Sequence, residues 1–156
     1  TLYNQLYGLA TCTLRLSNPY GEYQRVDGKQ GAVTIFCHKA LIGETIKIWG
    51  DGSVVRDFIY VKDAVRAMLQ TIVSECAGMV INIGYGKGIS LNQLLEHIEA
   101  VCGHMINKEY MFARNFDVPK IYLDIGRAKK VLGWEPEVSL FDGINLLINA
   151  MMKHKH

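Results

Sequence analysis

Strand-forming runs alternate with helix-forming runs along the whole chain, and this alternation restricts the fold more than any other feature of the sequence. No internal repeat, low-complexity tract or Pro/Ser-rich linker interrupts it. Helices that alternate with strands cover the faces of a mostly parallel sheet. With 156 residues, 49% of them apolar, the chain is long enough to bury one real core. We therefore expect an α/β fold in which residues 1–156 form a single domain.

Capping and turn residues predict where the elements begin and end. The expected helix caps are Asp63, Ser90, Asp124 and Ser139, and the expected helix stops are Gly43 and Gly133. The helix opened by Asp63 is expected to bury its apolar residues, which are Val65, Met68, Leu69, Ile72 and Val73. Residues 17–21 (SNPYG) are expected to turn, because Pro19 fixes its own φ and restricts Asn18. Leu2 and Leu6 are expected to lie in the last turns of a helix that begins before Thr1.

Composition and charge disfavour several classes of function. The chain has a small net charge of +2, and its Lys and Arg residues are scattered among acids. We therefore expect no nucleic-acid partner and no membrane-surface partner. No run approaches the roughly 20 apolar residues of a membrane span, and no signal peptide is present, so a cytoplasmic location is expected. Cys12, Cys37, Cys76 and Cys102 are far apart and form no C-x-x-C pair, which predicts reduced thiols and no metal site.

The glycine-rich run 84–88 (GYGKG) has the setting of a phosphate-binding loop, because it lies between a strand-forming run and a helix-forming run. The details do not fit. Ile89 stands where a dinucleotide fingerprint needs its last glycine, and Lys87 is followed by Gly88 where a P-loop needs Ser or Thr. We therefore interpret this run as a tight structural turn.

Two arginines are candidate anion ligands. Arg56 lies beside a short strand-forming run, and it either binds a phosphate or forms a structural ion pair with Asp57 or Asp63. Arg114 and Asp117 pose the same choice: they are either surface charges, or an arginine on a phosphate with an acid that accepts from ribose hydroxyls.

Trp49 ends a strand-forming run beside glycines, so its ring either fills the core or offers a face to a base. None of the five histidines indicates a catalytic site: His38, His97, His104, His154 and His156. No spacing suggests a Ser-His-Asp triad, a Cys-His pair or a pair of acids, so no catalytic residue is predicted.

Taken together, the ordered motifs resemble the extended short-chain dehydrogenase/reductase family, and in particular its UDP-glucose 4-epimerase group with relatives in polysaccharide biosynthesis. The motifs are 14–21 (LRLSNPYG), 30–31 (QG), 46–52 (IKIWGDG), 56–63 (RDFIYVKD), 82–84 (NIG), Arg114 with 117–119 (DVP), and 132–136 (LGWEP). The resemblance runs nearly end to end. It implies the carboxyl-terminal, substrate-binding lobe together with the last strands of a Rossmann-like doubly wound sheet, truncated before Thr1.

The resemblance also implies roles for individual residues. Asn18 matches an asparagine that binds the substrate near its phosphate, and Pro19 lies in the segment that lines the nicotinamide of NAD. Val33 matches a backbone contact to the diphosphate. The remaining implied substrate contacts are Lys47 and Trp49 to the uracil, Arg56 and Arg114 to the diphosphate, and Asp117 to the ribose.

Several parts of the family pattern are missing. The glycine-rich NAD loop, the Ser/Thr and the Tyr-x-x-x-Lys pair all precede the region that matches this chain. Tyr3 and Tyr7 cannot replace that pair, because neither has a lysine four residues later. NAD is therefore expected in the complete enzyme and not on this chain alone. Glu22 stands where relatives usually carry proline, which is expected to leave the loop after Gly21 less constrained.

The leading hypothesis is the UDP-sugar-binding portion of an NAD-dependent sugar 4-epimerase, catalytically incomplete alone. A second hypothesis is a free-standing module that binds a sugar nucleotide or associates as a homodimer or larger assembly through the apolar face left by truncation. The carboxyl-terminal half of a dTDP-sugar dehydratase is a further alternative, because similar motifs serve UDP-sugars and dTDP-sugars. A hydrolase that uses Cys and His has no motif behind it.

Overall fold

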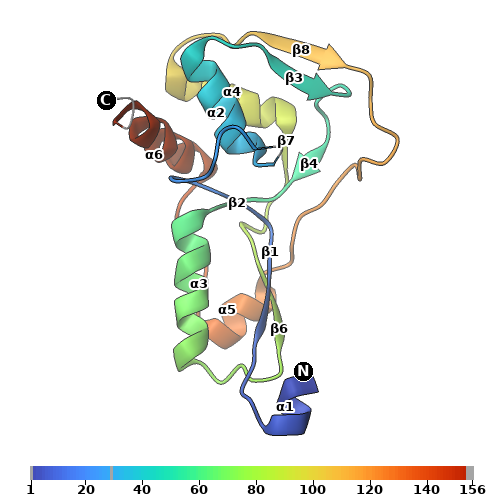
Figure 1. Ribbon diagram of the computed structural model, residues 1–156, viewed down its shortest axis with the longest axis vertical. Helices are drawn as coiled ribbons and strands as arrows, with labels where there is room; N and C mark the ends of the chain where they lie inside the picture. The colour runs from blue at the N-terminus through green and yellow to red at the C-terminus, as the bar shows by residue number, and fades with distance from the viewer. Residues whose placement is uncertain (1, 29, 154–156) are drawn as a thin grey trace.

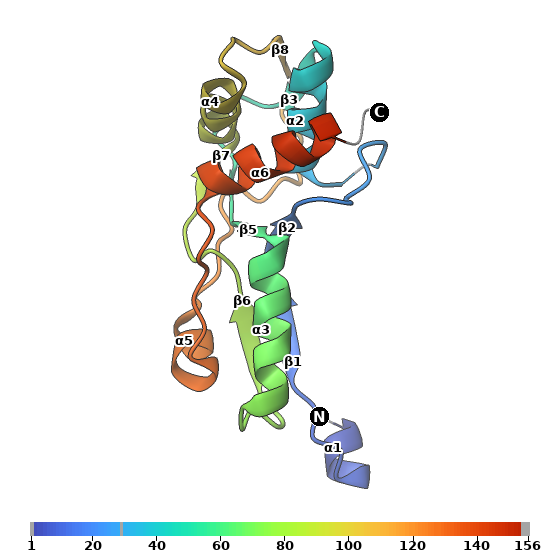
Figure 2. The ribbon, with the colours of Figure 1, turned by 90° about the vertical axis from the view of Figure 1, so that its left-hand side faces the viewer.

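The computed structural model describes residues 2–28 and 30–153. Thr1, His154 and His156 lie outside the described residues, as does the expectation that a helix begins before Thr1. The molecule is elongated (Figures 1 and 2). One end carries the helices α2 (Ala32–Ile42), α4 (Leu91–Cys102) and α6 (Leu140–Lys153). The other end carries α3 (Val61–Val73) and α5 (Gly126–Leu132) beside the strands β1 (Thr13–Leu16) and β6 (Val80–Ile83), and α1 (Leu2–Tyr7) lies at the far tip. The alternation of strands and helices confirms the predicted α/β class.

The strands of the described chain pair in twos. Three pairs are parallel: β1 (Thr13–Leu16) with β6 (Val80–Ile83), β2 (Asn18–Tyr20) with β5 (Phe58–Tyr60), and β3 (Ile46–Trp49) with β8 (Lys108–Met111). β4 (Val55–Arg56) pairs antiparallel with β7 (Ile89–Ser90). Parallel strands need a crossover between them, and the long connection from β1 to β6 includes α2 and α3, of which α3 lies directly before β6.

Three helices build the larger core: α2 (Ala32–Ile42), α4 (Leu91–Cys102) and α6 (Leu140–Lys153). Gly43 ends α2 in the left-handed conformation, as predicted. The predicted capping box at the start of α4 is confirmed, because Ser90 Oγ accepts from the Gln93 amide and Gln93 Oε1 accepts from the Ser90 amide. Ser139 Oγ accepts from the Asp142 amide, which confirms the predicted cap of α6.

A second, smaller core lies under β1 and β6, between α3 (Val61–Val73) and α5 (Gly126–Leu132). Trp134 fills its centre and is 1% exposed. Gly133 ends α5 in the left-handed conformation, as predicted. The predicted cap Asp124 is wrong by one position, because Ile125 occupies the N-cap, although Asp124 Oδ1 accepts from the Gly126 amide at 2.8 Å. The helix α1 (Leu2–Tyr7) buries none of its residues.

Strand β5 contributes to both cores. Phe58 and Tyr60 belong to the larger core, whereas Ile59, on the opposite face of the strand, belongs to the smaller one. All three side chains are buried.

The turn predicted at 17–21 is wrong for its central residues. Asn18–Tyr20 form β2, in register with Phe58–Tyr60. Proline is compatible with extended backbone, and it is tolerated here because β2 has only one partner strand in the described chain. The tertiary pairing therefore overrides the local turn tendency.

Two predictions for α3 are wrong. The helix begins at Val61, and Asp63 does not cap it; the Asp63 carboxylate accepts instead from the amides of Glu137 and Val138 at 3.0 Å each and pairs with Arg66. The residues that α3 buries are Asp63, Ala64 and Ala67. The five apolar residues predicted to be buried are all exposed, up to 78% for Val73, because the helix packs through its narrow alanine face.

Candidate functional site

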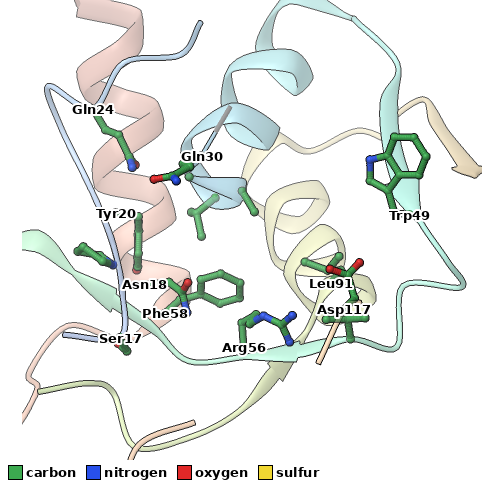
Figure 3. Close-up of a pocket in the computed structure, with 15 residues that line it drawn as sticks. Ser17, Asn18, Tyr20, Gln24, Gln30, Trp49, Arg56, Phe58, Leu91 and Asp117 are labelled. Atoms are coloured by element: carbon green, nitrogen blue, oxygen red, sulfur yellow. The ribbon is translucent and has the colours of Figure 1, made fainter. Parts of the chain in front are cut away.

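An open cleft of ≈ 590 Å³ lies where β2, β4 and the end of β3 meet the amino-terminal ends of α2 and α4 (Figure 3). Six of the residues singled out from the sequence line this cleft: Asn18, Pro19, Val33, Trp49, Arg56 and Asp117. They come from five separate segments of the chain. The fold therefore brings most of the expected ligand-binding residues to one place.

Arg56 lies in the cleft wall on β4, and its guanidinium points along the cleft (Figure 3). Its Nη1 donates to the carbonyl oxygens of Val55 at 2.8 Å and Val118 at 2.7 Å. The ion pair with Asp57 or Asp63 that we considered is not formed, because both acids are engaged elsewhere. The remaining N–H groups of this fixed guanidinium are left for an anion.

The amino terminus of α2 opens into the same cleft. Gly31 precedes the helix with a φ of 98°, no side chain caps it, and its first turn carries no acid. The first amide groups of a helix lack intrahelical partners, and together with the helix dipole they favour a bound anion. Val33, in this first turn, lines the cleft. Arg56 and the α2 amino terminus thus present positive potential from two sides.

Trp49 lies at the end of β3 and is 40% exposed, so it is not the core filler that we considered. Its ring borders both the cleft and a neighbouring recess of ≈ 400 Å³. Arg114 lines only the recess, and its guanidinium stacks on the Trp49 ring with Cζ 4.1 Å from the ring centroid. Arg114 therefore supports Trp49 in this structure and does not line the cleft itself.

Lys47 lies two residues before Trp49 on β3 and is exposed on the same face of the strand. It lines neither the cleft nor the recess. The Asp117 carboxylate lines both cavities and forms no ion pair within the described chain. It remains available as an acceptor for a hydroxyl group.

The β2 segment is held to the floor of the cleft by the main chain of Asp57. The backbone amide of Asn18 donates to the Asp57 carbonyl at 3.0 Å, and its side-chain Nδ2 donates to the same oxygen at 2.8 Å. Its amide oxygen is left for a ligand. Next to it, the Ser17 Oγ is buried without a hydrogen-bond partner in the described chain and also borders the cleft.

The glycine-rich loop 84–88 is a structural turn, as interpreted from the sequence, and an internal anion fills it. The buried Asp57 carboxylate accepts from the amides of Tyr85 at 2.7 Å, Gly86 at 3.1 Å and Leu123 at 3.2 Å. A Cβ at Gly84 would lie 2.5 Å from Asp57 Oδ2, so glycine is needed for this close approach. Two of the loop amides, those of Tyr85 and Gly86, are therefore engaged by Asp57 and not by a phosphate.

Sequence reasoning missed nine residues that line the cleft: Ser17, Tyr20, Gln24, Gln30, Gly31, Ala32, Val54, Phe58 and Leu91. Five of them lie within motifs already quoted, but no binding role was assigned to them: Ser17, Tyr20, Gln30, Gly31 and Phe58. Tyr20 is buried, and burial raises the pKa of its phenol well above the usual range. It therefore stays protonated near neutral pH.

Comparison with known proteins agrees with this geometry. A model of the NAD dependent epimerase/dehydratase family matches residues 1–84, more than half of the chain. The chain belongs to this family. A second model, for the 26S proteasome regulatory subunit RPN5 C-terminal domain, matches only residues 88–114.

Individual family members match almost the whole chain. The crystal structure of UDP-glucose 4-epimerase from Thermotoga maritima with UDP-glucose superposes with a TM-score of 0.94 and 39% identity, covering 99% of this chain and 50% of that one. The dTDP-4-dehydro-6-deoxyglucose reductase of Escherichia coli is 40% identical over 89% of this chain and 44% of its own length. The UDP-glucuronate 4-epimerase of Thermodesulfobacterium geofontis is 37% identical over 94% and 45%. The chain spans about half the length of the curated relatives it matches.

The loop that most resembles a dinucleotide cradle is filled by Asp57, and Pro19 is the only residue for which a nicotinamide contact is expected. Within residues 2–28 and 30–153, no cluster of three His, Cys, Asp or Glu side chains is arranged to hold a metal ion. The four cysteines are free thiols. None of the described helices is long and apolar enough to cross a bilayer.

Proposed function

We propose that this chain is the UDP-sugar-binding portion of an NAD-dependent sugar 4-epimerase and is catalytically incomplete alone. The observation that carries the proposal is the cleft itself, where the α2 amino terminus, Arg56, Trp49 and Asp117 face one space. The α2 amino terminus and Arg56 suit a diphosphate, Trp49 suits a planar base, and Asp117 suits a ribose. The solved structure of the Thermotoga maritima relative with UDP-glucose supports the choice of ligand class.

In this proposal each residue has a binding role. The α2 amide groups and Arg56 hold the diphosphate from two sides, because both favour negative charge. Trp49 stacks on the uracil, backed by Arg114, and the Lys47 main chain contacts the uracil edge. Asp117 accepts hydrogen bonds from the ribose, and Asn18 binds near the phosphate. Arg114 stacks on the Trp49 ring in this structure, and its expected contact with the diphosphate stays a prediction.

The binding groups would serve the reaction by orientation. Fixing the nucleotide at several points presents the sugar in one position, which reduces the entropy cost of the chemical step. We assign NAD to the complete enzyme, with Pro19 at the nicotinamide, and we assign no catalytic residue to this chain. The hydride chemistry that NAD supplies belongs to that complete enzyme.

Isothermal titration calorimetry tests the proposal. UDP-glucose, dTDP-glucose and NAD are titrated into the 156-residue chain, into Arg56→Ala and into Arg127→Ala. Arg127 is a matched control, because its Nη1 also donates to a backbone carbonyl, that of Val80 at 2.8 Å, but it does not line the cleft. Binding of a sugar nucleotide that is lost in Arg56→Ala and kept in Arg127→Ala supports the proposal.

Other outcomes contradict it in distinct ways. If neither sugar nucleotide binds at millimolar concentration, the chain is not a binding lobe in isolation. Stronger binding of dTDP-glucose favours the alternative of a dTDP-sugar enzyme, for which the reductase of Escherichia coli is the related example. Tight binding of NAD removes the assignment of that cofactor to the complete enzyme.

A second candidate function, a free-standing associating module, is favoured by the exposed face of α3. Its apolar side chains are Val65, Met68, Leu69, Ile72 and Val73, all 42–78% exposed. Contiguous apolar surface of this kind marks an interaction site. We propose that a second copy of the chain covers this face. Light scattering coupled to gel filtration should give a dimer or larger species that Ile72→Glu converts to monomer, and a monomeric wild-type chain would refute the idea.

A further inference from the structure

We propose that Glu22 is a positioning residue, which clasps the loop formed by residues 21–28, 30 and 31 against Tyr60 and thereby sets the wall of the cleft. The inference deepens the proposed function and rests on it for the ligand that is measured. Glu22 does not line the cleft, so its effect on a ligand passes through the loop.

The clasp is a hydrogen bond between the loop and the start of α3. Glu22 Oε1 accepts from the Tyr60 hydroxyl at 2.6 Å, and Lys62 Nζ lies 3.4 Å from the same oxygen. The Glu22 side chain is only 17% exposed. A short hydrogen bond to a carboxylate, sheltered from solvent, is among the stronger polar contacts in proteins.

Tyr60 is a rigid anchor for this clasp. It is 1% exposed, lies on β5 and packs its ring against Tyr20, with ring centroids 5.7 Å apart. Tyr20 in turn lines the cleft. The loop begins beside the same anchor, because Gly21 passes so close to Val61 that a Cβ there would collide with the valine side chain. The beginning of the loop is thus fixed to the strand that carries both cores.

The clasp continues into the cleft wall. Two residues after Glu22, Gln24 Oε1 accepts from the hydroxyl of the buried Thr34 on α2. Gln24, Gln30 and Gly31 all line the cleft (Figure 3). The other charged contact in this loop, between Arg25 and Asp27, is exposed and local, and such pairs fix little. Glu22 thus ties the loop to Tyr60 and Lys62 before the loop reaches the cleft.

This arrangement adds a restraint that the expectation of a less constrained loop at Glu22 did not include. A proline would stiffen the backbone by fixing φ. Glu22 instead fixes the loop through its side chain. Since the side-chain contact is removable without changing the backbone, the role can be tested by single substitutions.

The experiment measures UDP-glucose affinity by calorimetry and amide hydrogen exchange of residues 22–31 in the full chain. The variants are Glu22→Ala, Glu22→Gln, Tyr60→Phe and the double variant Glu22→Ala/Tyr60→Phe. Glu44→Ala is the matched control, because Glu44 also pairs with a lysine, Lys39 at 3.4 Å, but lies away from the cleft. Exchange is measured without ligand, so it tests the clasp even if UDP-glucose does not bind.

Glu22→Ala and Tyr60→Phe should each speed exchange in the loop and weaken binding about tenfold, as expected for loss of one hydrogen bond to a charged group. The double variant should be no weaker than either single one, because both remove the same contact. Glu22→Gln keeps an acceptor for Tyr60 and should recover most of the affinity. A merely structural role would not give this recovery together with the non-additivity.

Unchanged exchange of residues 22–31 in Glu22→Ala refutes the clasp whatever the ligand does. Faster exchange with unchanged affinity refutes the link from the clasp to the cleft. If the wild-type chain does not bind UDP-glucose, the proposed function fails, while the exchange data still decide whether Glu22 positions the loop.

Discussion

Replacing Asp57 with alanine should cost this chain more stability than removing any exposed acid. The carboxylate is wholly buried and accepts from three backbone amides, at 2.7, 3.1 and 3.2 Å. In Asp57→Ala those amides lose a charged acceptor, and a buried donor without a partner costs about 1–3 kcal/mol. Part of this loss is offset, because burying the carboxylate was itself unfavourable.

The net destabilisation should therefore be about 3–5 kcal/mol, in the range found when one partner of a buried charged contact is removed. For a chain of this size, that corresponds to a fall in Tm of roughly 6–20 °C. Urea and thermal unfolding followed by circular dichroism measure both quantities. Asp57→Asn should be no more stable than Asp57→Ala, because the side-chain NH₂ of the asparagine would point at backbone N–H groups that need an acceptor.

Two further variants make the reasoning specific. Asp51→Ala is the control, because this exposed carboxylate accepts from the amide and hydroxyl of Ser53 and should behave as an ordinary surface residue. Gly84→Ala should destabilise the wild type by about 1–3 kcal/mol through its clash with Asp57, and much less in the Asp57→Ala background. An Asp57→Ala variant within about 1 kcal/mol of wild type would show that these amides do not depend on the carboxylate.

Two other predictions concern the cleft and the loop. The chain has two tryptophans, of which Trp134 is 1% exposed and Trp49 is 40% exposed, so acrylamide should quench Trp49 selectively. Bound UDP-glucose should protect it, and a ligand-dependent signal that persists in Trp49→Phe would place the ligand elsewhere. Burial alone would raise the pKa of Glu22, but hydrogen bonds from Tyr60 and Lys62 lower it below the usual range. The difference in unfolding free energy between wild type and Glu22→Gln should therefore be constant from pH 8 to 5 and shrink only below about pH 4. A change in this difference near neutral pH would contradict a lowered pKa of Glu22.

Local signals in the sequence predicted much of the fold. The capping box of Ser90 and Gln93 and the stops at Gly43 and Gly133 act within a few residues, and the structure confirms them. The glycine-rich loop was also interpreted correctly as a turn. The carboxylate that this loop surrounds belongs to Asp57, which lies 27 or more residues earlier in the chain, so no local pattern in the sequence indicates it.

Contacts between distant segments account for the failures. Asn18–Tyr20 form a strand because Phe58–Tyr60 lie beside them, which no local rule for Pro19 anticipates. The apolar residues of α3 read as a buried face, but the helix packs through Ala64 and Ala67.

In the cleft, too, local motifs were predictable and contacts between distant segments were not. The segments that carry Arg56, Trp49 and Asp117 were recognisable one by one. The stacking of Arg114 on Trp49 and the clasp of Glu22 on Tyr60 required the assembled fold.

The three-residue strand β5 has a consequence for how the chain unfolds. Its side chains alternate between the two cores, and a slip of one residue against β2 would send each to the wrong side. Loss of either core therefore removes contacts that hold this strand in register for the other. We expect the elongated chain to unfold in one cooperative transition, with coincident melting monitored in Trp134 of the smaller core and in the helices of the larger one.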